Sequence, residues 1–74
     1  LLKALAMNPR FDAAYLNLGV TYNKLGEYQN AVSALTKATE LRKDWVIGIN
    51  ELGVAFRQMN NFKEAVRQFE RAVN

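Results

Sequence analysis

The stretch Leu18-Gly19-Val20 returns later in the chain as Leu52-Gly53-Val54. The two glycines, at positions 19 and 53, lie 34 residues apart, and other residues repeat at the same offset. Small residues pair with small ones and large residues with large ones: Ala31-Val32 with Ala65-Val66, Tyr22 with Phe56, Tyr28 with Phe62, Leu35 with Phe69, and Ala38 with Ala72. A fixed period of this length is typical of a protein built from stacked structural repeats.

Each period contains two segments with the apolar spacing of a helix. Apolar and small residues recur every three or four positions, which places them on one helical face. In the first period these faces comprise Tyr15, Leu18, Gly19, Tyr22 and Leu25, and then Tyr28, Ala31, Val32, Leu35, Ala38 and Leu41. In the second they comprise Ile49, Leu52, Gly53, Phe56 and Met59, and then Phe62, Ala65, Val66, Phe69, Ala72 and Val73. No useful length of chain alternates as a strand does, so the sequence predicts an all-α fold of antiparallel helix-turn-helix units.

The predicted helices have recognisable start and stop signals. Asp12 and Asp44 are placed to cap the first helix of each unit. Gly26 and the pair Asn60-Asn61 are placed to end those helices, because glycine and asparagine best tolerate the left-handed backbone conformation of a helix end. We expect the aromatic residues near each helix start to staple it onto the preceding unit: Phe11 and Trp45.

This unit resembles the tetratricopeptide repeat, or TPR. The residues that carry the resemblance are Tyr15, Leu18, Gly19, Tyr22, Ala31, Leu35 and Ala38 in the first unit, and Ile49, Leu52, Gly53, Phe56, Ala65, Phe69 and Ala72 in the second. The resemblance implies a right-handed superhelix of stacked antiparallel helix pairs. Two positions depart from the family pattern: Lys43 replaces a turn proline and Ile49 replaces an aromatic residue. The pentatricopeptide RNA-binding repeat, of about 35 residues, fits the period and the Leu-Gly placement less well.

The repeat register divides the chain into three parts. Residues 12–45 form a complete repeat, and residues 46–74 form a nearly complete repeat that lacks its final turn. Residues 1–11 match the C-terminal part of the second helix of a preceding repeat and its turn, with Pro9 at the family's proline position. We interpret the chain as a fragment of a longer array, since about three repeats are needed for stability.

The composition argues against several classes of function. The 74 residues include no His and no Cys, so His general bases, thiol nucleophiles and Cys/His zinc sites are excluded. We therefore expect no enzyme activity, catalytic residue, metal or cofactor in this chain. The formal charge of +3 is too weak to imply a nucleic acid partner. No apolar run reaches membrane-spanning length and no targeting segment is recognised. The absence of Cys is compatible with any compartment, and we slightly favour the cytoplasm.

The resemblance implies that the first helices of successive repeats line a concave groove that binds a protein partner. Rotating away from the predicted core face gives a set of residues three or four positions apart, which we call the stripe: Ala13, Leu16, Asn17, Val20, Asn23, Ile47, Asn50, Glu51, Val54 and Arg57. Asparagine amides suit a peptide backbone, and Arg57 suits a carboxylate. We predict that the stripe binds a peptide or a partner helix; the alternative is a merely solvated helix face.

A second hypothesis is a structural spacer that self-assembles. Repeat ends that are not covered leave apolar surface, which favours association of copies into a homo-oligomer. The residues expected to drive this are Leu1, Leu2 and Leu5 at one end, and Val66, Phe69 and Val73 at the other. A monomer with frayed ends is the alternative.

Two narrower interpretations are less well supported. A clamp for the acidic C-terminal tails of chaperones requires basic residues where this chain has Ile47 and Glu51, although Asn17 fits. Lys63, Arg67 and Arg71 form a basic ridge on the last helix, which we interpret as a solvated face in which Glu64 pairs with Arg67.

Overall fold

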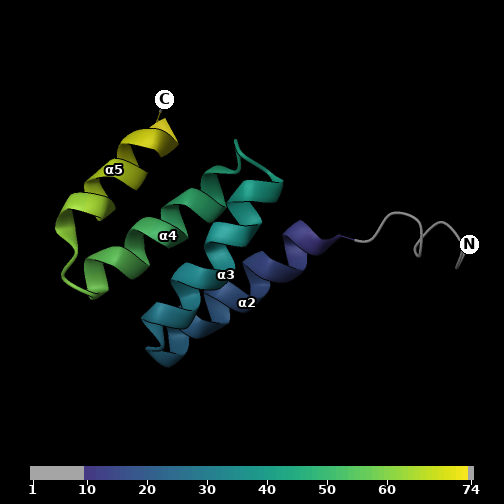
Figure 1. Ribbon diagram of the computed structural model, residues 1–74, viewed down its shortest axis with the longest axis horizontal. Helices are drawn as coiled ribbons and strands as arrows, with labels where there is room; N and C mark the ends of the chain where they lie inside the picture. The colour runs from purple at the N-terminus through teal and green to yellow at the C-terminus, as the bar shows by residue number, and fades with distance from the viewer. Residues whose placement is uncertain (1–9, 74) are drawn as a thin grey trace, which may run out of the picture.

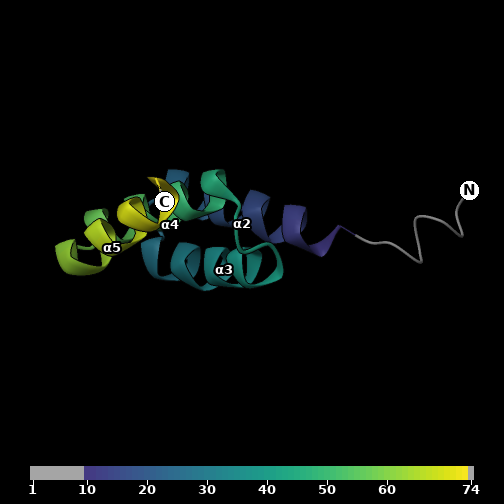
Figure 2. The same cartoon turned by 90° about the horizontal axis from the view of Figure 1, so that it is seen from above.

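The computed structural model describes residues 10–73, which form four helices (Figure 1). These are α2 (Phe11–Leu25), α3 (Tyr28–Leu41), α4 (Val46–Gln58) and α5 (Phe62–Val73). α2 packs against α3 and α4 packs against α5, while α3 and, to a lesser extent, α2 pack against α4. Figure 2 shows α2 and α4 together along one side of the molecule, with α3 on the other. The predicted all-α class is confirmed, and no strand is present between residues 10 and 73.

The two helix pairs have the same turn, as the repeat predicts. Gly26 has φ 79° and Asn60 has φ 64°, so both lie in the left-handed region. In each turn the backbone N–H that follows donates to a carbonyl five residues earlier, Glu27 to Tyr22 and Asn61 to Phe56, both at 2.9 Å. This hydrogen bond pairs a carbonyl that the helix end leaves free. The stop signals read from the sequence are therefore confirmed.

The predicted helix caps were wrong. α2 begins at Phe11, so Asp12 lies inside the first turn, where its Oδ1 accepts the Ala13 N–H at 2.8 Å and Arg10 Nε at 3.3 Å. The Ala13 hydrogen bond, assisted by Arg10, lowers the pKa of the Asp12 carboxyl, and desolvation opposes this shift. α4 begins at Val46 after Trp45, so Asp44 lies one residue too early to cap it.

The expected aromatic staple differs at the two helix starts. Phe11 belongs to α2 and is 61% exposed, and the preceding unit onto which it is expected to pack lies outside the described residues. Trp45 is half-buried in the turn before α4. The Arg42 guanidinium lies 4.4 Å from the centroid of its ring, a cation–π contact that fixes the turn between α3 and α4.

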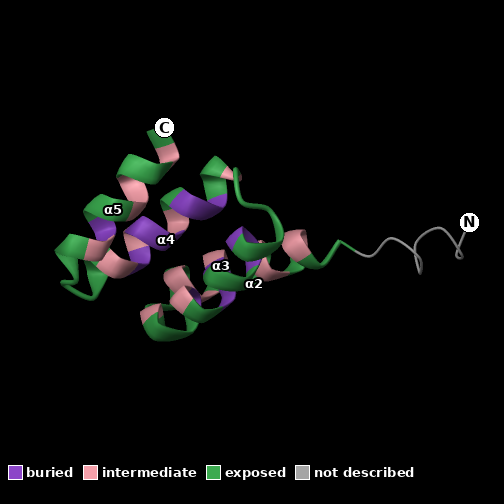
Figure 3. Ribbon diagram, turned by 45° about the horizontal axis from the view of Figure 1, so that its top comes forward, coloured by how far each residue is buried: buried purple, intermediate pink, exposed green. Residues whose placement is uncertain are grey.

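The core forms where small residues of one helix receive large residues of the next. Leu35 is fully buried and clusters with Ala31, Leu52 and Ala55, so the centre of the core lies between α3 and α4 (Figure 3). Within each helix pair, a large side chain lies directly on a glycine. A Cβ on Gly53 would lie 2.7 Å from a ring carbon of Phe69, and a Cβ on Gly19 would overlap Leu35. The recurrence of these glycines therefore reflects close helix packing, since there is no room for a methyl group.

The two equivalent leucines of the Leu-Gly pairs differ in burial. Leu52 is 3% exposed because it packs into the cluster with Ala31 and Leu35 of α3. Leu18 was predicted to be a core residue but is 44% exposed, and Leu25 is 65% exposed. Among residues 10–73, α2 contacts only α3 and α4, so no described helix covers Leu18 as α3 covers Leu52.

Candidate functional site

The two halves of the stripe form one surface. They lie on α2 and α4, which run along the same side of the molecule (Figure 2). A hydrogen bond joins them: Asn23 Nδ2 donates to the main-chain oxygen of Glu51 at 3.1 Å and to its Oε1 at 2.9 Å. Asn23 and Glu51 come from different repeats, so this contact fixes α2 and α4 next to each other.

Three stripe residues are used within the fold. Leu16 packs against the core cluster, and its side chain lies beside Gly48 of α4. Asn23 and Glu51 bond to each other across the two repeats. The Asn23 Oδ1 is buried and, within residues 10–73, accepts no hydrogen bond. These three residues therefore take part in the packing of α2 against α4.

The other seven stripe residues face solvent wholly or in part. Asn17, Ile47, Asn50 and Arg57 are exposed, while Ala13, Val20 and Val54 are half-buried. Ile47 is 59% exposed, a large fraction for an isoleucine on a helix of a packed domain. The surface thus combines apolar side chains, amides that can both donate and accept, and one cation.

The described residues contain neither a cluster of metal ligands nor a membrane-spanning helix. Between residues 10 and 73, no three His, Cys, Asp or Glu side chains are gathered where they could hold a metal ion. The helices in that range are also too short or too polar to cross a bilayer. The stripe carries hydrogen-bond donors, acceptors and apolar groups, which are also the groups found in protein–protein interfaces.

The residues expected at the repeat ends have different environments. Leu1, Leu2 and Leu5 lie outside the described residues. Val66 is 54% exposed and Val73 is 84% exposed, so both present apolar surface. Phe69 is half-buried because its ring lies on Gly53 within the same repeat. Of the residues at the C-terminal end, the two valines therefore provide the accessible apolar surface.

The basic ridge on α5 is divided between two roles. Arg67 forms an ion pair with Glu64, with 2.9 Å between Nη1 and Oε2, as the helical spacing predicts. Arg71 instead donates to Gln68 Oε1 at 3.2 Å and to the main-chain oxygen of Lys43 at 3.5 Å. The contact with Lys43 links the second repeat to the turn that precedes it. The sequence gives no sign of this contact, because the residue equivalent to Arg71 is Lys37 and its equivalent partner would lie at position 9.

The fold and the 34-residue register define a helical-repeat protein with a surface suited to protein binding. Comparison with models of known families matches residues 13–44 and residues 49–74, in both cases to a model described as tetratricopeptide repeat. The chain therefore belongs to the tetratricopeptide repeat family. Members of this family serve generally as scaffolds for protein–protein interaction and are typically not catalytic.

Proposed function

We propose that the stripe on α2 and α4 binds an extended peptide or a helix of a partner protein. The observation that carries this proposal is the hydrogen-bonded pair of Asn23 and Glu51. Because the pair joins the two helices, a ligand would meet a continuous surface that spans two repeats. A preorganised surface of this kind binds with a smaller entropy cost than one that must first be assembled.

The solvent-facing stripe residues offer complementary chemistry to a polypeptide. The amides of Asn17 and Asn50 can each donate to a peptide carbonyl and accept from a peptide N–H. Val20, Val54 and Ile47 provide apolar contacts for ligand side chains between these amides. Exposed apolar side chains ringed by polar groups are typical of interaction surfaces.

The test uses a peptide selected on the unmodified chain from a random display library. We expect Val20→Glu and Val54→Glu together to weaken binding of that peptide at least about tenfold, because each places a charge beside an apolar contact. The control variant Gln29→Glu adds one such charge at an exposed position of α3. Helicity is recorded for every variant, so that loss of folding is not mistaken for loss of binding. Unchanged affinity in folded Val20→Glu/Val54→Glu would refute the proposal.

A second candidate function is self-assembly through apolar repeat ends. It is supported by the exposure of Val66 and Val73 on α5, and by that of Phe11 and Leu18 on α2. We expect the mass in sedimentation equilibrium to rise with concentration above 8.4 kDa, and Val66→Ser/Val73→Ser to lower it. A constant 8.4 kDa species across the series would exclude this function for the chain.

A further inference from the structure

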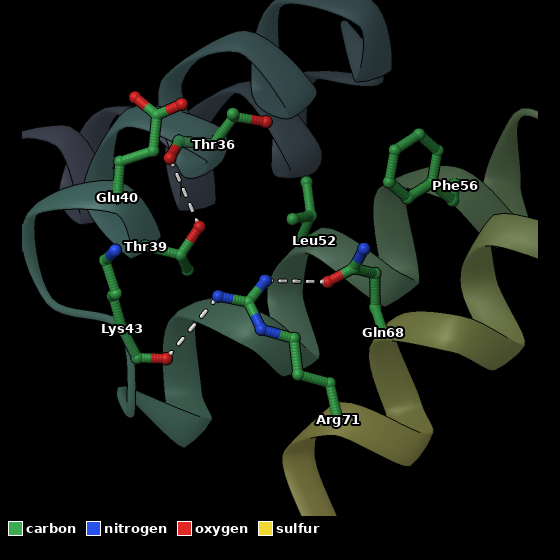
Figure 4. Close-up of a pocket in the computed structure, with 8 residues that line it drawn as sticks. All are labelled: Thr36, Thr39, Glu40, Lys43, Leu52, Phe56, Gln68 and Arg71. Carbon is green, nitrogen blue, oxygen red and sulfur yellow. Dashed lines mark hydrogen bonds between the residues drawn. The ribbon is translucent and has the colours of Figure 1, made fainter.

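A cavity lies between α3 and α5, with α4 as its floor (Figure 4). Its volume is about 350 Å³, and it exists because α3 and α5 do not pack against each other. Leu52 and Phe56 of α4 form an apolar floor, and Thr36 and Thr39 line the wall on α3. We call this cavity the α3/α5 groove. No stripe residue lines it, so it is a separate surface from the one proposed above.

Two cations lie on opposite walls of the α3/α5 groove. Figure 4 shows Arg71 extending from α5 across the opening toward Lys43, whose main-chain oxygen it contacts. Lys43 lies in the turn that follows α3, and it lines the groove together with Glu40 of α3. Within residues 10–73, none of these three charged groups forms an ion pair. The lining therefore carries one more positive than negative charge, and no ion pair within the described residues neutralises it.

The same arrangement is present one repeat earlier. A second cavity, of about 300 Å³, lies against α2 and α3. Four of its lining residues correspond, at the 34-residue offset, to lining residues of the α3/α5 groove: Leu18 to Leu52, Tyr22 to Phe56, Ala34 to Gln68 and Lys37 to Arg71. Each repeat thus places a cation of its second helix next to a leucine and an aromatic ring of its first helix. The recurrence indicates that the combination of charge and apolar surface belongs to the repeat and is not confined to one cavity.

We propose that the α3/α5 groove binds an extended peptide in which an Asp or Glu neighbours a bulky apolar residue. The carboxylate would lie between Arg71 and Lys43, because a guanidinium and an ammonium both donate strong hydrogen bonds to carboxylates. The apolar side chain would lie over Phe56, and Glu40 would accept a peptide N–H. A nucleic acid fits less well, since Glu40 repels a continuous polyanion and the floor offers no contact to phosphate.

The binding test compares two labelled peptides with blocked ends. One alternates leucine with aspartate, and the other has asparagine in place of every aspartate. We expect the aspartate peptide to bind at least about tenfold more tightly in fluorescence anisotropy, and added salt to reduce this difference. Equal affinity for the two peptides would overturn the proposal, because the cations would then contribute nothing.

Variants locate the peptide on the molecule. Arg71→Gln is expected to lower the affinity for the aspartate peptide about tenfold. Arg67→Gln, a matched change one turn earlier on α5, is expected to leave this affinity unchanged. Lys43→Gln is also expected to weaken binding of the aspartate peptide, and it keeps the main-chain oxygen that Arg71 contacts. If Arg71→Gln disturbs folding, the affinity of Lys43→Gln for this peptide therefore tests the location of the site. Equal losses for Arg71→Gln and Arg67→Gln, or binding abolished only by Val20→Glu/Val54→Glu, would contradict the assignment to this groove.

Discussion

Gly19→Ala tests the claim that helix packing, and not backbone flexibility, requires the glycine. A methyl group on Gly19 would overlap Cγ of Leu35, the largest fully buried side chain among residues 10–73. Overpacking of this kind costs about 1–3 kcal/mol. Alanine in a helix interior is favoured over glycine by about 1 kcal/mol, which offsets part of that cost. We therefore expect a net loss of about 1 kcal/mol in the free energy of unfolding, or about 4–8 °C in Tm.

The background Leu35→Ala reverses the sign of the same substitution. Leu35→Ala alone lowers the free energy of unfolding by about 2–5 kcal/mol, since it removes a fully buried side chain and leaves a cavity. In that background the methyl group of Gly19→Ala meets no Leu35 Cγ, so the substitution is expected to stabilise by about 1 kcal/mol. Urea titrations of the four proteins, followed by circular dichroism, give the coupling between the two sites. An osmolyte such as TMAO keeps the weakest variant folded.

Two results would refute this reasoning. Gly19→Ala could stabilise the unmodified chain, or it could have the same effect in both backgrounds. A control for the helix-propensity contribution is Ala14→Gly, at an exposed position of the same helix, which is expected to cost up to about 1 kcal/mol. If this control cost nothing, the offset used above would be wrong.

Further predictions follow from the turn, the acidic residue near the start of α2 and the contact between repeats. A Cβ added at Gly26 has no neighbouring atom within 4 Å, so only the left-handed φ of 79° opposes alanine there. Gly26→Ala should therefore lower the free energy of unfolding by about 1 kcal/mol in urea titrations, and Gly26→Asn should lower it less. The lowered pKa of Asp12 means that this carboxylate stabilises the fold above its unfolded pKa of about 3.9 and loses that effect as pH falls through the folded value. Asp12→Asn should therefore reduce the acid sensitivity of Tm below about pH 4, and an unchanged profile would refute this. Asn23→Ala should cost about 1 kcal/mol, whereas Glu51→Ala should cost less because Asn23 retains the main-chain oxygen as an acceptor; a larger loss for Glu51→Ala would contradict that order.

The sequence predicted those features that depend on short-range pattern. The four helices and the two left-handed turns follow from helical spacing and from Gly26 and Asn60, and the structure has both. The helix starts were misjudged at Asp12 and Asp44, because a cap depends on the last residue with non-helical dihedrals and the pattern fixes this only to within a residue or two.

Features that depend on neighbours in space were harder to predict. Leu18 and Leu52 both begin the tripeptide Leu-Gly-Val, but only Leu52 is buried, since it packs into the cluster with Ala31 and Leu35 of α3. The spacing of the stripe gave no sign that Asn23 and Glu51 bond to each other, because the two residues lie on different helices. Arg71 was assigned to a solvated ridge because its contact with Lys43 joins residues 28 positions apart.

The glycine contact within each helix pair has a consequence for how such a gene can change. Leu35 lies on Gly19 and Phe69 lies on Gly53, so each close fit is completed inside its own repeat. Unequal crossing-over that deletes or duplicates 34 residues joins equivalent positions and leaves every glycine facing a bulky partner. A deletion that joins the chain at the equivalent turns of Gly26 and Asn60 would pair Gly19 with Phe69 in place of Leu35. Only the shape of the bulky side chain in that helix pair would change. The lengthening and shortening of such an array thus preserve the glycine contact within each helix pair.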